Sequence, residues 1–197
     1  GDDALAKAIA EFGTLTQWYR PGSFFAYCNT GFYLTGRIIE KVTGKPFETV
    51  MQEELRDPLG LEHTFILPEY ALGRPFATGH KVDRREGVTV AESQSLPRCV
   101  NAAGGIMSSI GDLMRFARMH LNRGELDGIR IISEESALAM QEPLIEAGSP
   151  NRSYGIGWSI FEHPDAQTIG HGGAWGGHRA NLTIVPEKDF AIAMLAN

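Results

Sequence analysis

The feature that most restricts the fold is a change in hydrophobic pattern along the chain. Segments within the first 140 residues space their apolar residues as helices do, whereas the last third alternates as strands do. The predicted strands are 154–161, 167–169, 180–185 and 190–195, with 186–189 joining the last two as a hairpin. Helices followed by consecutive strands favour an α+β fold, in which helices pack on an antiparallel sheet.

Five helices are predicted, over residues 4–12, 31–43, 46–57, 109–121 and 133–140. In the second, Leu34, Ile38 and Val42 share one face, with Ile39 beside them. Asn29 or Thr30 is expected to cap this helix, and Gly44 to end it in a left-handed conformation. Residues 60–100 look irregular, apart from a weak strand signal at 88–90, and such long irregular regions are often functional.

Composition and charge exclude some functions. The chain has 197 residues, which is about one domain, and no internal boundary is apparent. Its net charge of −6 argues against nucleic-acid binding, and no run of eighteen apolar residues predicts a membrane span. The compartment is not indicated. Cys28 and Cys99 could pair, but they have no metal-type spacing, and free thiols are the simpler expectation.

The triplet Tyr27-Cys28-Asn29 stands at the entrance of the predicted helix 31–43. A phenol fixed by a rigid helix is a good proton carrier or hydrogen-bond donor. The simpler interpretation is a capped surface helix with one tyrosine packed behind it. Spacing alone favours the simpler interpretation.

A second candidate site is the glycine-rich stretch from Gly170 to His178. Glycines let a substrate approach the backbone closely, although the stretch could also be a glycine-rich turn with an incidental histidine. His171, His178 and His163 could together bind a metal ion. Nothing gives these three a known ligand spacing, and no HExxH motif exists, so no metal or cofactor is expected.

Several motifs in order resemble the serine β-lactamase and penicillin-binding superfamily, in its class C β-lactamase, D,D-peptidase and carboxylesterase branch. The matching segments run nearly end to end: Arg20–Gly22, Tyr27–Gly31, Gly36–Phe47, Pro58–Leu61, Ala103–Ser108 and Gly170–Gly173. The resemblance implies a β-lactamase/transpeptidase-like α+β fold. It also implies a cofactor-free serine hydrolase that cleaves a small ester, peptide or other amide, or β-lactam through an acyl-enzyme.

The resemblance also implies roles for particular residues. Tyr27 would pass a proton to and from the lysine of a Ser-x-x-Lys motif, and Asn29 would hold the substrate amide or carbonyl. His171-Gly172-Gly173 would lie on an edge strand facing the cleft, with His171 as a donor or positive charge near Tyr27. Gly173 would leave room for substrate, and the N–H of Ala174 would form half of an oxyanion hole. Region 60–100 would wall the cleft. His171 stands where dedicated β-lactamases have a lysine. By this resemblance, esterase or D-alanyl-D-alanine carboxypeptidase-like activity is favoured over antibiotic resistance.

The chain departs from the family pattern in one respect. None of its serines has lysine three residues later, and the nearest imitation, Thr78-Gly79-His80-Lys81, follows Tyr27 instead of preceding it. We therefore expect residues 1–197 to be a partial domain that lacks the nucleophile segment, and the final strand and helix as well. Such a chain should not turn over alone, and it should be marginally stable or self-associate.

Two other functions stay open. One is a catalytically inactive module of the same fold that binds peptide or cell-wall fragments. The other is a plain structural domain with Trp158 and Trp175 in its core. If the family interpretation holds, Tyr27 and His171 should lie across a single cleft.

Overall fold

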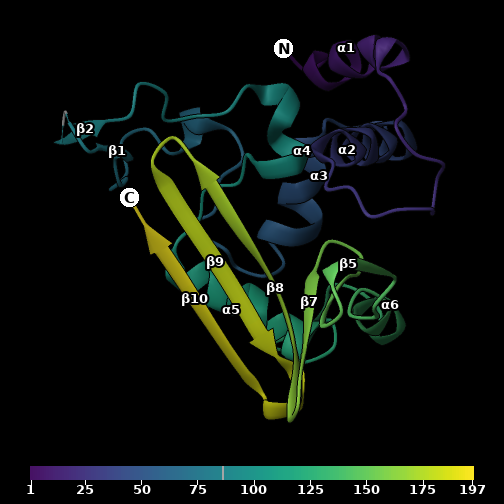
Figure 1. Ribbon diagram of the computed structural model, residues 1–197. Coiled ribbons are helices and arrows are strands. Elements are labelled where there is room, and N and C mark those ends of the chain that lie inside the picture. The colour runs from purple at the N-terminus through teal and green to yellow at the C-terminus, as the bar shows by residue number, and fades with distance from the viewer. Residues whose placement is uncertain (86) are drawn as a thin grey trace.

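Residues 145–196 form a six-stranded antiparallel sheet in a computed structural model that describes residues 1–85 and 87–197 (Figure 1). Each strand pairs with its neighbour in sequence, so the order across the sheet is β10-β9-β8-β7-β6-β5. The strands are β5 (Ile145–Ser149), β6 (Arg152–Tyr154), β7 (Ser159–His163), β8 (Ala166–Trp175), β9 (His178–Val185) and β10 (Phe190–Ala196).

The α-helices precede this sheet in the sequence, and a short connection joins α6 to β5. They are α1 (Ala4–Ala10), α2 (Asn29–Thr43), α3 (Phe47–Met51), α4 (Asn101–Gly104), α5 (Ile110–Leu121) and α6 (Glu134–Ala139). Two small hairpins lie between them, β1 (His80–Asp83) with β2 (Gly87–Val90), and β3 (Glu125–Leu126) with β4 (Ile129–Arg130). The predicted α+β fold with helices on an antiparallel sheet is confirmed. No helix in the described residues has the length and apolar character needed to cross a membrane.

The main core lies between α5 and one face of the sheet. Alternate residues of the strands point toward α5, as the pleat requires. The buried residues of this core are Ala117, Trp158, Ile160, Ile169, Leu182 and Ile184. A second buried cluster, to which α5 contributes Met119, also contains Leu59, Leu61 and Leu126. Each fully buried large side chain contributes roughly 1.5–3 kcal/mol, so α5 and the sheet form the stable base of the fold.

A serine side chain caps the N-terminus of α5. Ser109 Oγ accepts a hydrogen bond from the Asp112 N–H at 3.2 Å. The Asp112 carboxylate does not return to Ser109 but accepts from the His63 N–H and the Thr64 hydroxyl, at 2.8 and 2.7 Å. This buried carboxylate therefore ties the segment after α3 to α5.

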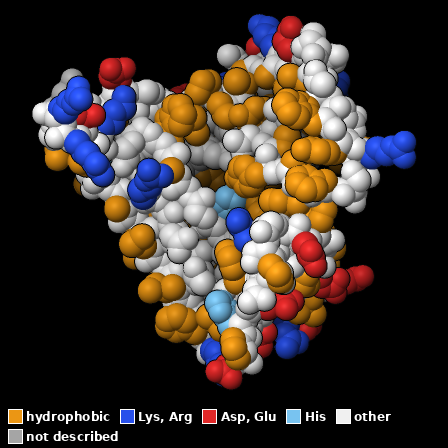
Figure 2. Space-filling view, viewed as in Figure 1, with side chains coloured by type: hydrophobic (Ala, Val, Ile, Leu, Met, Phe, Trp, Pro, Cys, Tyr) orange, Lys and Arg blue, Asp and Glu red, His pale blue; other side chains and the backbone are white. Residues whose placement is uncertain are grey.

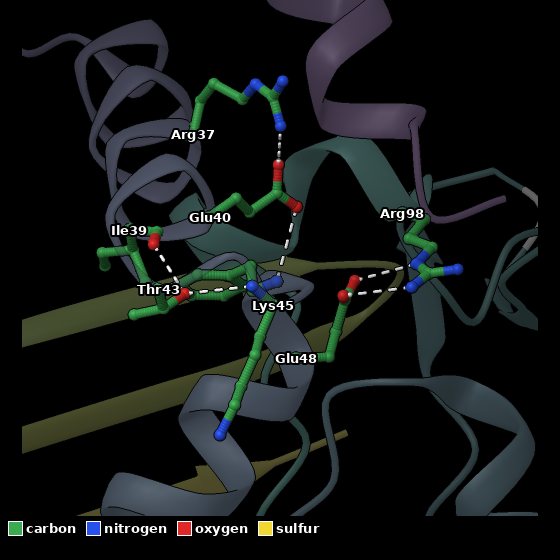
Figure 3. Close-up of polar contacts among 8 residues, drawn as sticks. Arg37, Ile39, Glu40, Thr43, Lys45, Glu48 and Arg98 are labelled. Atoms are coloured by element: carbon green, nitrogen blue, oxygen red, sulfur yellow. Dashed lines mark hydrogen bonds and ion pairs between the residues drawn. The ribbon is translucent and has the colours of Figure 1, made fainter.

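Helices α1 to α4 gather at one end of the molecule, where polar contacts fix α2 (Figure 1, Figure 3). Glu40 is buried; it accepts from Arg37 at 2.7 Å and from the N–H of Phe47, the first residue of α3, at 3.4 Å. Glu48 of α3 accepts from the Arg98 guanidinium at 3.0 and 3.2 Å. Gly44 ends α2 with φ of 71°, as predicted. The C-terminal half of α2 is thus anchored, which fixes the direction of its N-terminal end.

Three local predictions need correction. The segment 154–161 is not one strand, because Gly155–Trp158 forms a turn in which Gly157 has φ of 80° and β6 pairs back with β7. The pattern missed this turn because its apolar residues continue the alternation. The stripe Leu34, Ile38 and Val42 is exposed, and α2 buries Gly36 and Glu40 instead. The glycine there permits a close helix contact that hydropathy does not register.

The third correction concerns the start of α2. The helix begins at Asn29 with Cys28 as its N-cap residue, and no side chain caps it. Asn29 and Thr30 already lie in the first helical turn, so the predicted cap by either residue is wrong. The Thr30 hydroxyl lies 2.7 Å from Cys28 Sγ.

Candidate active site

The two residues predicted as catalytic meet, although 144 positions separate them in the chain. Tyr27 Oη lies 3.4 Å from His171 Nε2, and the two ring centroids are 6.0 Å apart. The expected proximity of Tyr27 and His171 is therefore found, while their position across a single cleft and their chemical roles stay predictions. A contact of 3.4 Å is longer than a strong hydrogen bond, and Tyr27 is exposed. Its hydroxyl is consequently accessible to a bound molecule.

A second tyrosine, absent from the sequence-based prediction, contacts the same histidine. Tyr154 ends β6, is 9% exposed, and places its hydroxyl 3.0 Å from His171 Nε2. Burial raises the pKa of Tyr154, and the neighbouring Tyr27 raises that pKa further. No local motif marks Tyr154, since it looks like any aromatic residue of a strand; only the sheet register brings it to His171.

The glycine-rich stretch lies at a local edge of the sheet. Gly170 is the last β8 residue that pairs with β7, opposite Ser159, and residues 171–175 pair only with β9. The predicted edge position therefore holds for this stretch, although β8 as a whole is interior. Gly172 and Gly173 are exposed here, so at these two positions only backbone borders the space beside the edge.

The turn after β8 sets the direction of its backbone groups. Gly176 and Gly177 have φ of 53° and 83°, which fits a two-residue type I′ hairpin closed by Trp175 and His178. The closing pair of such a hairpin is hydrogen-bonded, and the ladder alternates, so Ala174 and Arg179 form a non-hydrogen-bonded pair. The N–H of Ala174 therefore points away from β9, toward the open edge.

A cavity of about 540 Å³ lies beside this edge. Gly173, Ala174 and Trp175 line one side, and the irregular region with the residues up to Ser109 supplies much of the rest. In Figure 2 the surface is hollowed between the helical end and the sheet, with hydrophobic side chains around the hollow. Trp175 is half exposed at this cavity, whereas Trp158 is buried in the core. The two tryptophans thus do not form the single core that a plain structural domain would need.

The ionisable side chains that line the cavity are all arginine or histidine. They are Arg74, Arg179, His63 and His178, and the described lining includes no aspartate or glutamate. Arg74 stacks over the Phe65 ring at 4.9 Å. Arg179 makes no hydrogen bond or ion pair within the described part of the chain, so its guanidinium remains available in an otherwise acidic protein.

The other residues considered from the sequence are two cysteines, Asn29 and two further histidines. Cys28 and Cys99 are free thiols, and the hydrogen bond with Thr30 lowers the pKa of Cys28. Asn29 is exposed and makes no side-chain hydrogen bond within the described residues. His178 contacts Gln94 at 3.3 Å and His163 contacts Thr168 at 3.4 Å. Across the described residues, no three histidine, cysteine or acidic side chains are grouped to hold a metal ion.

Comparison with known proteins shows what the chain is similar to. A family model described as "Beta-lactamase" matches residues 1–197. Penicillin-binding protein 4 of Amycolatopsis lactamdurans is 33% identical over 205 residues, which cover 100% of this chain and 53% of the relative. The chain spans about half the length of the curated relatives it matches.

Solved structures agree with the fold. The octameric penicillin-binding protein homologue from Pyrococcus abyssi superposes with a TM-score of 0.87 at 28% identity, covering 98% of this chain and 43% of that one. A D-stereospecific amidohydrolase from Streptomyces sp. gives a TM-score of 0.82 at 26% identity, covering 98% of this chain and 56% of the other. These matches span both the helical end and the sheet.

Proposed function

Because the chain belongs to the β-lactamase family, we propose that residues 1–197 are part of one serine hydrolase domain that transfers an acyl group from an amide, ester or β-lactam to water. The observation that carries this proposal is the approach of Tyr27 Oη to His171 Nε2 at 3.4 Å beside a glycine-lined strand edge. In the proposed reaction a serine attacks the carbonyl, the leaving group departs with a proton, and water then releases the acyl-enzyme.

Tyr27 and His171 are proposed to handle the proton. Tyr27 would take the proton of the nucleophile together with the motif's lysine and return it to the leaving group. His171 would lie beside the Tyr27 hydroxyl and influence its proton through their contact. The exposure of Tyr27 supports this role, since a phenol that shuttles protons must reach the bound substrate.

The backbone and Asn29 are proposed to bind the substrate. Gly172 and Gly173 leave space at the edge, and the N–H of Ala174 would donate to the developing oxyanion. A preorganised donor of this kind contributes roughly 3 kcal/mol in the transition state. The Asn29 side chain, at the entrance of α2, makes no hydrogen bond within the described residues. It would hold the substrate amide or carbonyl.

The nucleophile is the part of the site that this sequence does not supply. No serine of the chain has lysine three residues later. We infer that these 197 residues alone form no acyl-enzyme, and that hydrolysis needs a Ser-x-x-Lys motif located outside them. No cofactor enters the proposed reaction.

The lining of the cavity indicates the charge of the substrate. Arg74 and Arg179 face a space whose described lining contains no acidic side chain, in a chain of net charge −6. Such a basic recess in an acidic protein attracts anions. We propose that the substrate carries a free carboxylate, as the product-side residue of a D-peptide or a penicillin does, which favours carboxypeptidase-like over neutral-ester chemistry.

The experiment that tests this function is intact-mass spectrometry after incubation with a penicillin and, separately, with a fluorophosphonate. The 197-residue chain should remain unlabelled, and a longer chain from the same gene with a Ser-x-x-Lys motif should gain one adduct on that serine. An adduct mapped to any residue of the 197 would contradict the missing nucleophile. A longer chain that carries the motif and stays unlabelled would contradict the hydrolase.

The missing motif also favours one alternative, a binding module of the same fold that recognises peptide or cell-wall fragments. The upstream reading frame of the gene discriminates between the two. A complete domain without Ser-x-x-Lys that still binds a D-alanine-terminated peptide saturably would establish the binding module.

A further inference from the structure

Three polar groups surround the ring of His171, and they constrain its proton. Nδ1 lies 2.6 Å from the carbonyl oxygen of Gly172, while Nε2 lies 3.0 Å from Tyr154 Oη and 3.4 Å from Tyr27 Oη. A carbonyl oxygen can only accept, so Nδ1 must carry the hydrogen of this bond. A neutral imidazole with Nδ1–H presents a lone pair at Nε2, which then accepts from a hydroxyl.

Two hydroxyls compete for that one lone pair. Tyr154 is closer by distance and is buried, whereas Tyr27 is farther and exposed. A buried hydroxyl without an acceptor would cost about 1–3 kcal/mol, and His171 Nε2 is the acceptor that the structure gives Tyr154. Burial also raises the pKa of Tyr154, which keeps it a protonated donor. Tyr154 therefore takes the lone pair, and the Tyr27 hydroxyl is left uncommitted.

Packing holds Tyr154 in this position from two sides. Its ring lies 5.2 Å from Phe25, which precedes Tyr27, and meets the rings of Tyr27 and His171 edge-on at 6.4 and 6.3 Å. The backbone of Tyr154 pairs with Ile145 and Ser159, and Ser159 pairs with Gly170. The sheet register thus sets Tyr154 next to His171, and Phe25 sets it next to the α2 entrance.

We propose that Tyr154 is a positioning residue, which occupies Nε2 of His171 and, together with the Gly172 carbonyl, holds the ring as the Nδ1–H tautomer. The Tyr27 hydroxyl is then free for the substrate and the nucleophile. The catalytic consequence rests on the proposed function, but the tautomer and the hydrogen bond do not.

The test uses the 197-residue chain itself, at a pH where its histidines are neutral. Long-range ¹⁵N–¹H correlation spectra of the imidazole rings report which nitrogen carries the proton. We expect one Nδ1–H tautomer for His171 in the wild type and in Tyr27→Phe. In Tyr154→Phe, which keeps the ring but loses the hydroxyl, we expect a larger share of the Nε2–H tautomer, because the Gly172 carbonyl is then the main group left to favour Nδ1–H. Tyr70→Phe, at an exposed 3-10 turn, is the matched control and should leave the spectrum unchanged.

Two results would overturn the inference: an Nε2–H tautomer in the wild type, or an unaltered tautomer in a folded Tyr154→Phe. Should Tyr154→Phe not fold, the wild-type chain still decides. The Tyr154 hydroxyl proton should then exchange slowly with water and show an Overhauser effect to the His171 ring, and its absence would refute the hydrogen bond.

A kinetic arm separates this inference from the proposed function. In the longer, active protein, Tyr154→Phe should lower kcat about tenfold with little change in KM, since proton handling and not binding is disturbed. A tautomer change in the 197-residue chain without hydrolysis by the longer protein would uphold the positioning role and refute the hydrolase. Unaltered kcat in Tyr154→Phe would refute the catalytic consequence while the hydrolase stands.

Discussion

At the scale of single residues, His120 of α5 has the least favourable environment for a charge. It is 2% exposed, its ring meets those of Phe116 and Trp158 edge-on, and Nδ1 has no hydrogen-bond partner in the described structure. Burial lowers the pKa of His120 to about 4, from the ordinary 6.5. Protonating this histidine therefore favours the unfolded chain.

The stability of the chain should consequently fall as the pH drops from about 6.5 toward about 4. In that window His120 is protonated in the unfolded state but neutral in the folded state. The free energy of unfolding therefore falls by at most about 1.4 kcal/mol per pH unit as the pH drops. Urea unfolding at pH 7 and pH 5 should show a loss of about 2 kcal/mol in the wild type. His120→Leu should lack this part of the loss, and exposed His163→Gln should retain it. The same pH dependence in His120→Leu and the wild type would contradict the assignment.

Arg179 should decide whether the cavity prefers anions. Arg179→Gln removes the unpaired guanidinium opposite Ala174, and a hydrogen bond to a charged group contributes about 1.5–3 kcal/mol. NMR titration with N-acetyl-D-alanine should show binding weakened about tenfold, while the primary amide of the same compound should bind both proteins alike. Arg118→Gln makes the same charge change outside the cavity lining and should have little effect. If Arg179→Gln lowered the affinity for the acid and for the amide equally, Arg179 would not be the residue that binds the carboxylate.

Individual site residues were predictable from sequence only where a local pattern marks them. Tyr27 stands at a helix entrance and His171 within a glycine run, and both could be named in advance because these motifs in order resemble a known family, whereas spacing alone favours a structural tyrosine. Tyr154 carries no such mark, because its meeting with His171 depends on the register of β6, β7 and β8. The basic lining of the cavity likewise joins Arg74 and Arg179, whose proximity no spacing rule gives.

At the scale of elements, the periodicity of α2 predicts its length and end but not its buried face. Hydropathy shows which side of a helix is apolar, not which side this chain covers. The packing of α2 instead depends on Gly36, where an added Cβ would lie 2.5 Å from Ala102 Cβ and 3.1 Å from Leu5 Cδ2. This close approach brings α1 and α4 onto α2.

Gly36→Ala should therefore destabilise the protein, even though alanine is the better helix former. Overpacking costs about 1–3 kcal/mol, and the gain in helix propensity offsets at most about 1 kcal/mol of it. Gly31→Ala is the matched control, since it lies on the same helix with nothing within 4 Å of an added Cβ, and it should be neutral or stabilising. Denaturant midpoints measure both. A midpoint for Gly36→Ala as high as that of Gly31→Ala would contradict the close contact.

At the scale of the whole molecule, two apolar faces are uncovered within the described structure. One is the α2 stripe of Leu34, Ile38 and Val42, and the other is the outward face of β10, with Phe190, Ile192 and Met194. β10 is also an end strand of the sheet, so its outer backbone groups can pair with another strand. Exposed apolar faces of this kind mark surfaces that bind other chains.

We therefore expect the 197-residue chain to self-associate, and β10 to contribute more than α2. Strand edges add backbone hydrogen bonds to apolar burial, whereas the helix offers side chains alone. Sedimentation velocity over a concentration series should give a mass above the monomer value of 21.6 kDa that rises with concentration. Replacing Phe190, Ile192 and Met194 with threonine keeps strand propensity and should restore the monomer, while glutamine at the three α2 positions should only weaken association. A concentration-independent monomer in the wild type would contradict the expectation, and stronger rescue by the α2 variant would assign the contact to the helix.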